Sequence, residues 1–139
     1  MEDDKIKDWI KKNSLQFLIY LAIFSFAAYK IIENIADKNE VRNNYQVTVG
    51  EIVEYKVFGV GPNRYLTYEY IVNGKKYKRE INGPNRIFDE CADGIAFCSD
   101  KSFLVVYSRI NPSKSMINLT REIQDTEDIE LPKSLKSFQ

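Results

Sequence analysis

An uncharged, strongly apolar segment near the start of this 139-residue chain most limits what the chain can fold into. No Asp, Glu, Lys or Arg occurs between Asn13 and Tyr29, whereas Lys12 and Lys30 flank the segment. A helix rising about 1.5 Å per residue covers roughly 27 Å between these lysines, close to a hydrocarbon thickness of about 30 Å. Residues 13–30 are therefore predicted to form a single transmembrane helix.

Two other interpretations of this segment stay open on the sequence alone. A cleaved signal peptide would use Ser25-Phe26-Ala27 as its small-x-small site. A soluble protein would instead bury the helix in its core. For a membrane anchor, the four lysines before the segment outnumber the three cations after it, which are Lys30, Lys38 and Arg42. This bias predicts that the N-terminal segment, residues 1–12, lies in the cytoplasm.

The stretch after the membrane segment is predicted to continue the helix as a stalk over residues 31–44. Neither Gly nor Pro occurs between Met1 and Asn44, so no residue of those types ends the helix at the membrane surface. Ile31, Ile32 and Ile35 prolong an apolar stripe on the helix.

Period-two alternation of apolar residues then predicts a small β domain over 45–120. The first strand carries Val47, Val49 and Val53, and Gly50 within it predicts a bulge or bend. The second strand places its apolar residues on one face, at Leu66, Tyr68, Tyr70 and Val72. Asn73-Gly74 is typical of a type I′ hairpin turn and leads into a third strand over 75–81.

Two further strands complete the predicted sheet. The continuous apolar run Phe103–Tyr107 fits a strand covered on both faces, and residues 116–120 predict a last, shorter strand. Such a chain belongs to the α+β class, with one transmembrane helix and a small antiparallel β barrel or rolled sheet of SH3-like or OB-like type. Residues 121–139 lack a periodic apolar face and are expected to be a flexible or partner-ordered tail.

Four short stretches of this domain carry a resemblance. They are Gly50-Glu51-Ile52-Val53, Tyr68-Glu69-Tyr70 through Asn73-Gly74-Lys75-Lys76-Tyr77, then Phe103-Leu104-Val105-Val106-Tyr107 and Asn111-Pro112. Together they resemble an uncharacterised family of small bacterial membrane-associated β domains. The resemblance covers residues 50–112 and implies a β domain paired with one or more membrane helices. It implies no activity.

The two cysteines, Cys91 and Cys98, are candidates for a disulfide. In an oxidising compartment, closing a loop of about eight residues would stabilise the fold by roughly 2.5 kcal/mol. The alternative is a pair of reduced thiols in a cytosolic domain. The spacing is not the Cys-x-x-Cys of redox proteins, and two thiols without His do not complete a zinc site, so no metal is expected.

Charge and composition narrow the classes of function. The chain has 20 Lys+Arg, 20 Asp+Glu and no His, which argues against nucleic acid as a partner and removes the commonest general base. No catalytic residue, enzymatic activity or cofactor is predicted. Cations and one tyrosine near the second and third strands form a possible interaction surface, at Lys56, Arg64, Tyr65, Lys75, Lys76, Lys78 and Arg79.

These features predict a membrane-tethered, extracytoplasmic protein-interaction module. It would be an accessory subunit of an envelope complex or an immunity-type protein, in the bacterial inner membrane with the β domain on the periplasmic side. The alternative is a β domain that binds lipid headgroups or a small ligand at the membrane surface, through Phe58, Tyr65 and neighbouring lysines.

Overall fold

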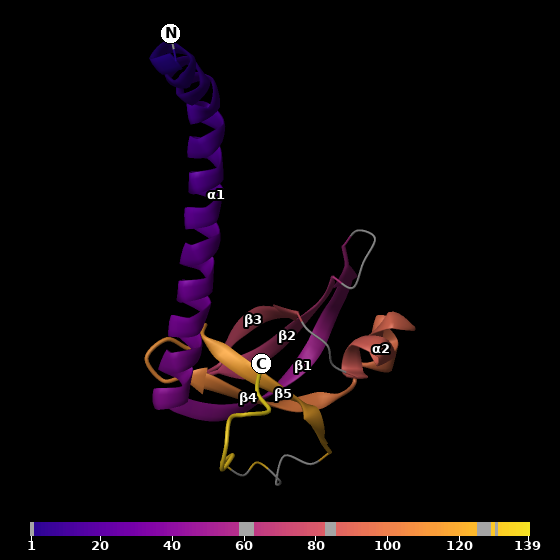
Figure 1. Ribbon diagram of the computed structural model, residues 1–139. Coiled ribbons are helices and arrows are strands. Elements are labelled where there is room, and N and C mark those ends of the chain that lie inside the picture. Colours follow the sequence, from indigo (N-terminus) through magenta and orange to yellow (C-terminus); the bar gives the residue numbers. More distant parts are fainter. Residues whose placement is uncertain (1, 59–62, 83–85, 125–128, 130) are drawn as a thin grey trace. The chain divides into compact units, whose positions relative to one another are not determined.

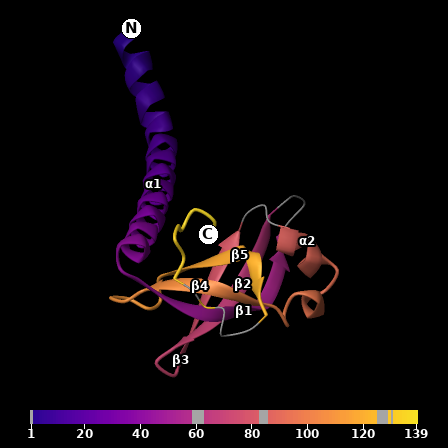
Figure 2. The same cartoon turned by 90° about the horizontal axis from the view of Figure 1, so that it is seen from below.

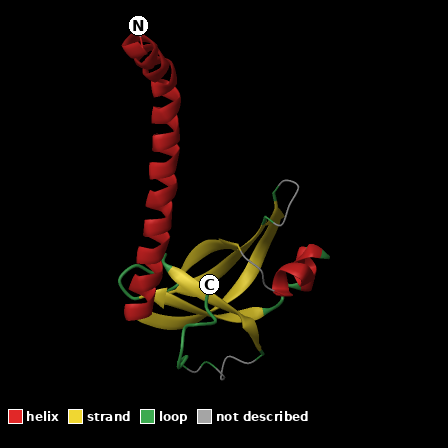
Figure 3. Ribbon diagram, in the orientation of Figure 1, coloured by secondary structure: helices red, strands yellow, loops and turns green. Residues whose placement is uncertain are grey.

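The computed structural model describes residues 2–58, 63–82, 86–124, 129 and 131–139, with side chains described from residue 13 onward. The long helix α1 (Glu2–Asn43) precedes five strands and two short helices (Figures 1 and 3). The chain forms two compact units, Met1–Ala36 and Asp37–Gln139. The first holds most of α1, and the second holds its last turns and the whole sheet.

Helix α1 contains the predicted membrane segment. Within residues Asn13–Asn43 an 18-residue window has a mean hydropathy of 1.8, so this helix is long and apolar enough to cross a membrane. None of the residues in that window is buried. Large apolar side chains such as Phe24 and Phe26 are exposed. The described chain therefore does not bury this helix in a core of its own. A signal segment would share the same length and composition.

The second unit is built on one antiparallel sheet. Its strands are β1 (Tyr45–Val57), β2 (Arg64–Val72), β3 (Lys75–Asn82), β4 (Ser102–Ser108) and β5 (Ser115–Ile123), in the spatial order β3-β2-β1-β4-β5 (Figure 2). Helix and sheet together confirm the α+β class. The sheet is not closed, because β3 and β5 form its two ends and do not pair with each other, so the barrel form of the prediction is not the one observed.

The sheet is strongly rolled. The hydroxyl of Tyr68 on β2 lies 2.8 Å from Oγ of Ser115 on β5, and the hydroxyl of Tyr70 donates to the carbonyl of Pro112 at 2.6 Å. Two strands separate β2 from β5 in the sheet, so these contacts require the sheet to curl over its own inner face. Tyr70 there stacks on Tyr68, Tyr77 and Tyr107, with ring centroids 5.7 to 6.4 Å apart.

Both faces of β4 are covered, as its continuous apolar run predicts. Val105 faces the inner core with the tyrosines, and Val106 faces a second cluster that contains Val41, Met116 and Phe138. Strand β4 therefore buries apolar surface on both faces, and each Å² removed from water stabilises the unit by roughly 25 cal/mol. The second cluster also connects the last turn of α1 with the C-terminal residues.

The role of Gly50 differs from the prediction. The irregularity of β1 lies between Ile52 and Glu54, whereas Gly50 pairs regularly with Tyr70 and Phe103. A Cβ atom at position 50 would lie 2.6 Å from Cγ2 of Val105. Glycine is therefore required by close packing on the neighbouring strand and not by a bulge. By contrast, Asn73 and Gly74 have φ values of 51° and 77°, as the predicted type I′ turn needs.

Two short helices and a longer last strand were missed by sequence reasoning. Helix α2 (Arg86–Ala92) buries Ile87, Phe88 and Cys91 against the core, and a single 3₁₀ turn, η1 (Ile95–Phe97), follows it. Strand β5 runs to Ile123, beyond the expected end at residue 120. Cys91 and Cys98 are joined by a disulfide with an S–S distance of 2.02 Å, which ties α2 to the segment before β4.

The C-terminal residues are packed and not free. Phe138 is 6% exposed in the second cluster, and Gln139 exchanges two backbone hydrogen bonds with Ile117 on β5 (3.0 and 3.2 Å). The expectation of a flexible tail over 121–139 therefore does not describe the end of the chain. Phe138 holds the end of the chain in place because it packs in one apolar cluster with Val41, Val106 and Met116.

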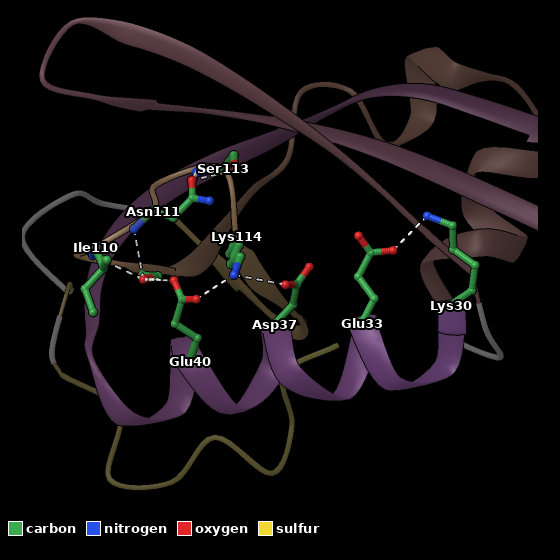
Figure 4. Close-up of polar contacts among 9 residues, drawn as sticks. Lys30, Glu33, Asp37, Glu40, Ile110, Asn111, Ser113 and Lys114 are labelled. Carbon is green, nitrogen blue, oxygen red and sulfur yellow. Dashed lines mark hydrogen bonds and ion pairs between the residues drawn. The ribbon is translucent and has the colours of Figure 1, made fainter. Parts of the chain in front are cut away.

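The end of α1 is fastened to the β4–β5 connection (Figure 4). Lys114 forms ion pairs with Asp37 at 3.2 Å and with Glu40 at 2.5 Å, and the Ser108 hydroxyl donates to Glu40 at 2.8 Å. Val41 beside them is completely buried. The last turn of the predicted stalk 31–44 is thus part of the β unit.

Candidate interaction surface at the open edge of the sheet

The residues predicted to form one interaction surface lie in two separate groups. Lys56, Arg64 and Tyr65 lie where β1 and β2 meet their connecting hairpin, and Lys56 pairs with Tyr65. The other four, Lys75, Lys76, Lys78 and Arg79, lie on β3, beginning at the opposite end of β2. Antiparallel pairing of β2 with β3 separates the groups along the strand, and spacing in the sequence did not reveal this.

The first group offers little free positive charge. Lys56 Nζ lies 2.9 Å from a carboxylate oxygen of Glu54, and Arg64 forms an ion pair with Asp89 of α2. The ring of Phe58, which is exposed, packs edge-on against Tyr65 at 5.4 Å. This end of the sheet therefore presents neutralised cations beside two aromatic rings.

The second group forms what we call the β3 edge, residues Lys75–Asn82. Its exposed outer face carries Lys76 and Lys78, both bonded to Glu69 of β2 at 2.6 and 3.4 Å. The hydrogen bond from Lys76, opposed by partial desolvation and aided by Lys78, holds the pKa of Glu69 below its ordinary value of 4.5. One carboxylate thus holds two lysines in fixed positions on this face.

The inner face of the β3 edge is half-buried and carries two apolar side chains, Tyr77 and Ile81, with Arg79 between them. Tyr77 and Ile81 pack against the inner core from its margin, and each remains partly exposed because no further strand lies beyond them in the described residues. Lys75 lies over the ring of Tyr77, with its Nζ 5.3 Å from the centroid. The apolar core is therefore covered on the side of β2 but remains partly exposed to solvent at β3.

The two ends of the sheet differ. Within the described parts of the chain, β3 makes backbone hydrogen bonds only with β2, which leaves the outward N–H and C=O groups of its other edge without a protein partner. At the other end of the sheet, Gln139 pairs with Ile117 and covers the edge of β5 near the start of that strand. An unpaired edge strand is a template for strand addition, so the β3 edge is a candidate site for another strand.

A test of this geometry uses the ionisation of Glu69. Replacing Lys76 by glutamine should raise the pKa of Glu69 toward 4.5, because the largest cause of its depression is removed. The depressed pKa stabilises the fold above the ordinary, unfolded-state pKa of 4.5, and this contribution is lost as pH falls through the lower folded value. Carboxyl NMR titration measures the shift. Lys75→Gln is the matched control and should leave the Glu69 titration unchanged.

A cleft of about 480 Å³ lies beside α2 but carries no clear chemistry. Its floor is apolar, from Ile87, Phe103 and Leu119, and its rim holds Glu90, which forms ion pairs with Arg86 and Lys101. Those two cations lower the pKa of Glu90, chiefly through the Lys101 hydrogen bond, so Glu90 is not poised as a general acid. Among the described residues no three metal-ligating side chains come together.

Comparison with known proteins adds no relative. No protein-family model, no curated protein and no solved structure matches this chain. The resemblance to a family of bacterial membrane-associated β domains therefore stays a prediction. The sequence analysis did not identify β3 as an edge strand, because the order of strands in a sheet cannot be inferred from neighbouring residues in the sequence. A partial signal was the run Lys75–Arg79 after a tight turn, since lysines are frequent on edge strands.

Proposed function

We propose that this protein is a single-pass protein of the bacterial inner membrane whose periplasmic β domain binds a protein partner as an accessory subunit of an envelope complex or as an immunity-type protein. The observation that carries the proposal is the asymmetry of the sheet: the β5 edge holds the chain's own Gln139 at Ile117, while the described part of the β3 edge has no backbone partner along its length. Strand addition uses such an edge for affinity and the alternating side chains for specificity.

Two other features support the location. Helix α1 is long and apolar enough to cross a membrane, and the Cys91–Cys98 disulfide fits an oxidising, extracytoplasmic compartment. Of the two architectures expected from the sequence, SH3-like and OB-like, we favour the OB-like type, because an OB-fold is a five-stranded, partly open barrel and this sheet has five rolled strands.

The alternative of lipid-headgroup binding has weaker support. Its best observation is the exposed Phe58 beside Tyr65, which would suit a membrane interface. However, Lys56 and Arg64 are each paired with a carboxylate, so few free cations surround these rings to meet anionic headgroups.

The proposal is tested by photo-crosslinking in the cells that produce the protein. A benzophenone amino acid in place of the exposed Glu80 on the β3 edge should form a covalent adduct with one protein of defined size. The same group in place of the exposed Thr120 on β5 is the matched control and should form none. Absence of any protein adduct from position 80 would refute the proposal.

A further inference from the structure

We infer that the β3 edge accepts an extended segment in which acidic residues alternate with apolar or aromatic ones. This inference rests on the proposed function and specifies the chemistry of its partner. The charge of the edge comes first: on its outer face Lys76 and Lys78 stand against the single carboxylate of Glu80, while Lys75 and Arg79 occupy the alternate, inner-face positions. An added strand places its side chains about 4.5–5.5 Å from those of its neighbour, close enough for these charges to select it.

Strand β2 shows which side chains β3 prefers on its other side. On the outer face Glu69 stands opposite Lys78 and binds both Lys78 and Lys76. On the inner face Tyr70 stands opposite Tyr77 and stacks on it at 5.7 Å. A strand added to the free edge meets the same lysines and the same tyrosine from the opposite side. It fits best when it presents an acidic side chain beside the lysines, as Glu69 does, and an apolar one beside Tyr77, as Tyr70 does.

The exposure of the inner-face residues supports this reading. Tyr77 and Ile81 belong to the margin of the core but keep part of their surface exposed. An apolar side chain opposite each of them would complete the burial that β2 begins. Each such cross-strand pair adds to the stabilisation that the backbone hydrogen bonds of the ladder provide.

A second copy of the chain matches this edge less well than an acidic strand does. When two β3 edges pair antiparallel, Lys76 or Lys78 meets Glu80 only in registers that also place Lys78 opposite Lys78 or Arg79 opposite Arg79. Like charges directly opposite destabilise a strand pair, so an acidic strand fits the lysines better than the edge fits itself.

The test uses the full chain in detergent micelles and a fluorescein-labelled nine-residue peptide in which glutamate alternates with valine and tyrosine. Fluorescence anisotropy should show saturable binding that weakens as salt concentration rises. A peptide of equal composition with all its glutamates at one end should bind at least about fivefold more weakly, since it cannot present one acidic and one apolar face. Amide hydrogen exchange should slow over residues 75–82.

Variants locate the binding. The double substitution Lys76→Thr and Lys78→Thr should weaken the peptide by about fivefold or more, because two cross-strand ion pairs are lost. The matched control, Lys133→Thr with Lys136→Thr, removes the same charge from exposed lysines of the C-terminal segment and should leave the affinity unchanged. Far-ultraviolet circular dichroism confirms that both variants keep their sheet.

Three outcomes would overturn the inference: no saturable binding, equal binding of the two peptides, or exchange protection outside β3. Protection of β3 by water-soluble, short-chain phosphatidylglycerol in place of the peptide would also overturn it, because the occupant would then be lipid. The proposed function fails separately. A protein adduct from position 80 without peptide binding would support the proposed function and contradict the inferred acidic partner strand. Peptide binding without any adduct in cells would support the preference for an acidic strand and contradict the proposed function.

Discussion

Replacing Phe138 by alanine should lower the free energy of unfolding of the β unit by about 3 kcal/mol, the low end of the range for truncating a buried phenylalanine. The ring fills the second cluster between Val41, Val106 and Met116, so its removal leaves a cavity among these side chains. For a unit of this size the midpoint of thermal unfolding should fall by roughly 12 to 24 °C. Near-ultraviolet circular dichroism of the stacked tyrosines follows the transition.

Leu131 supplies the control for this prediction. It is also a large apolar residue of the C-terminal segment, but it is 67% exposed, so Leu131→Ala should change stability by about 0.5 kcal/mol or less. If Phe138→Ala unfolded like the unchanged protein, the C-terminal residues would be free in solution. The end of the chain would then be the flexible tail expected from composition.

Loss of the Cys91–Cys98 disulfide should cost about 2.5 kcal/mol of stability. The bond closes a loop with a sequence separation of 7, and opening it restores the chain entropy of that loop to the unfolded state. Urea unfolding of the purified protein, with and without a thiol reductant, measures the difference. In the variant Cys91→Ala, Cys98→Ala the reductant should have no effect, which separates loss of this bond from other actions of the reductant.

The same pair reports the compartment. A membrane-impermeant thiol reagent applied to intact cells should label Cys91 and Cys98 only after reduction, because the bonded sulfurs do not react. Labelling that needs permeabilised cells and no reduction would contradict both the disulfide and the periplasmic position of the β domain. The Cys91→Ala, Cys98→Ala variant gives the background, since the chain has two cysteines in all.

Features set by neighbouring residues could be predicted from the sequence. The apolar span of α1, the start of β1 at Tyr45 and the tight turn at Asn73-Gly74 depend on composition, periodicity or the positive φ of two adjacent residues. The covered strand β4 was also predictable, because a run such as Phe103–Tyr107 has no polar face to expose. In each case the physical cause lies within a few residues of its effect.

Features that depend on residues far apart in the chain were not predictable. Gly50 is glycine because Val105, 55 positions later, lies against it, and the sequence shows only a glycine in a strand. Helix α2 has seven residues, too few for a helical period to stand out, and its stability comes from packing and the disulfide. The sequence also did not show that the predicted surface residues lie in two groups, or that β3 is an edge strand. Both features depend on the order of the strands in the sheet.

The Gln139–Ile117 pairing also bears on how molecules could join at this sheet. A sheet with two free edges can add strands at both and can stack copy upon copy into a fibre, since one molecule's edge becomes the template for the next. Here a chain that pairs with β5 near Ile117 must first displace the docked C-terminal residues. The docked residues therefore hinder edge-to-edge stacking at the start of β5, as covering an edge does in other sheets.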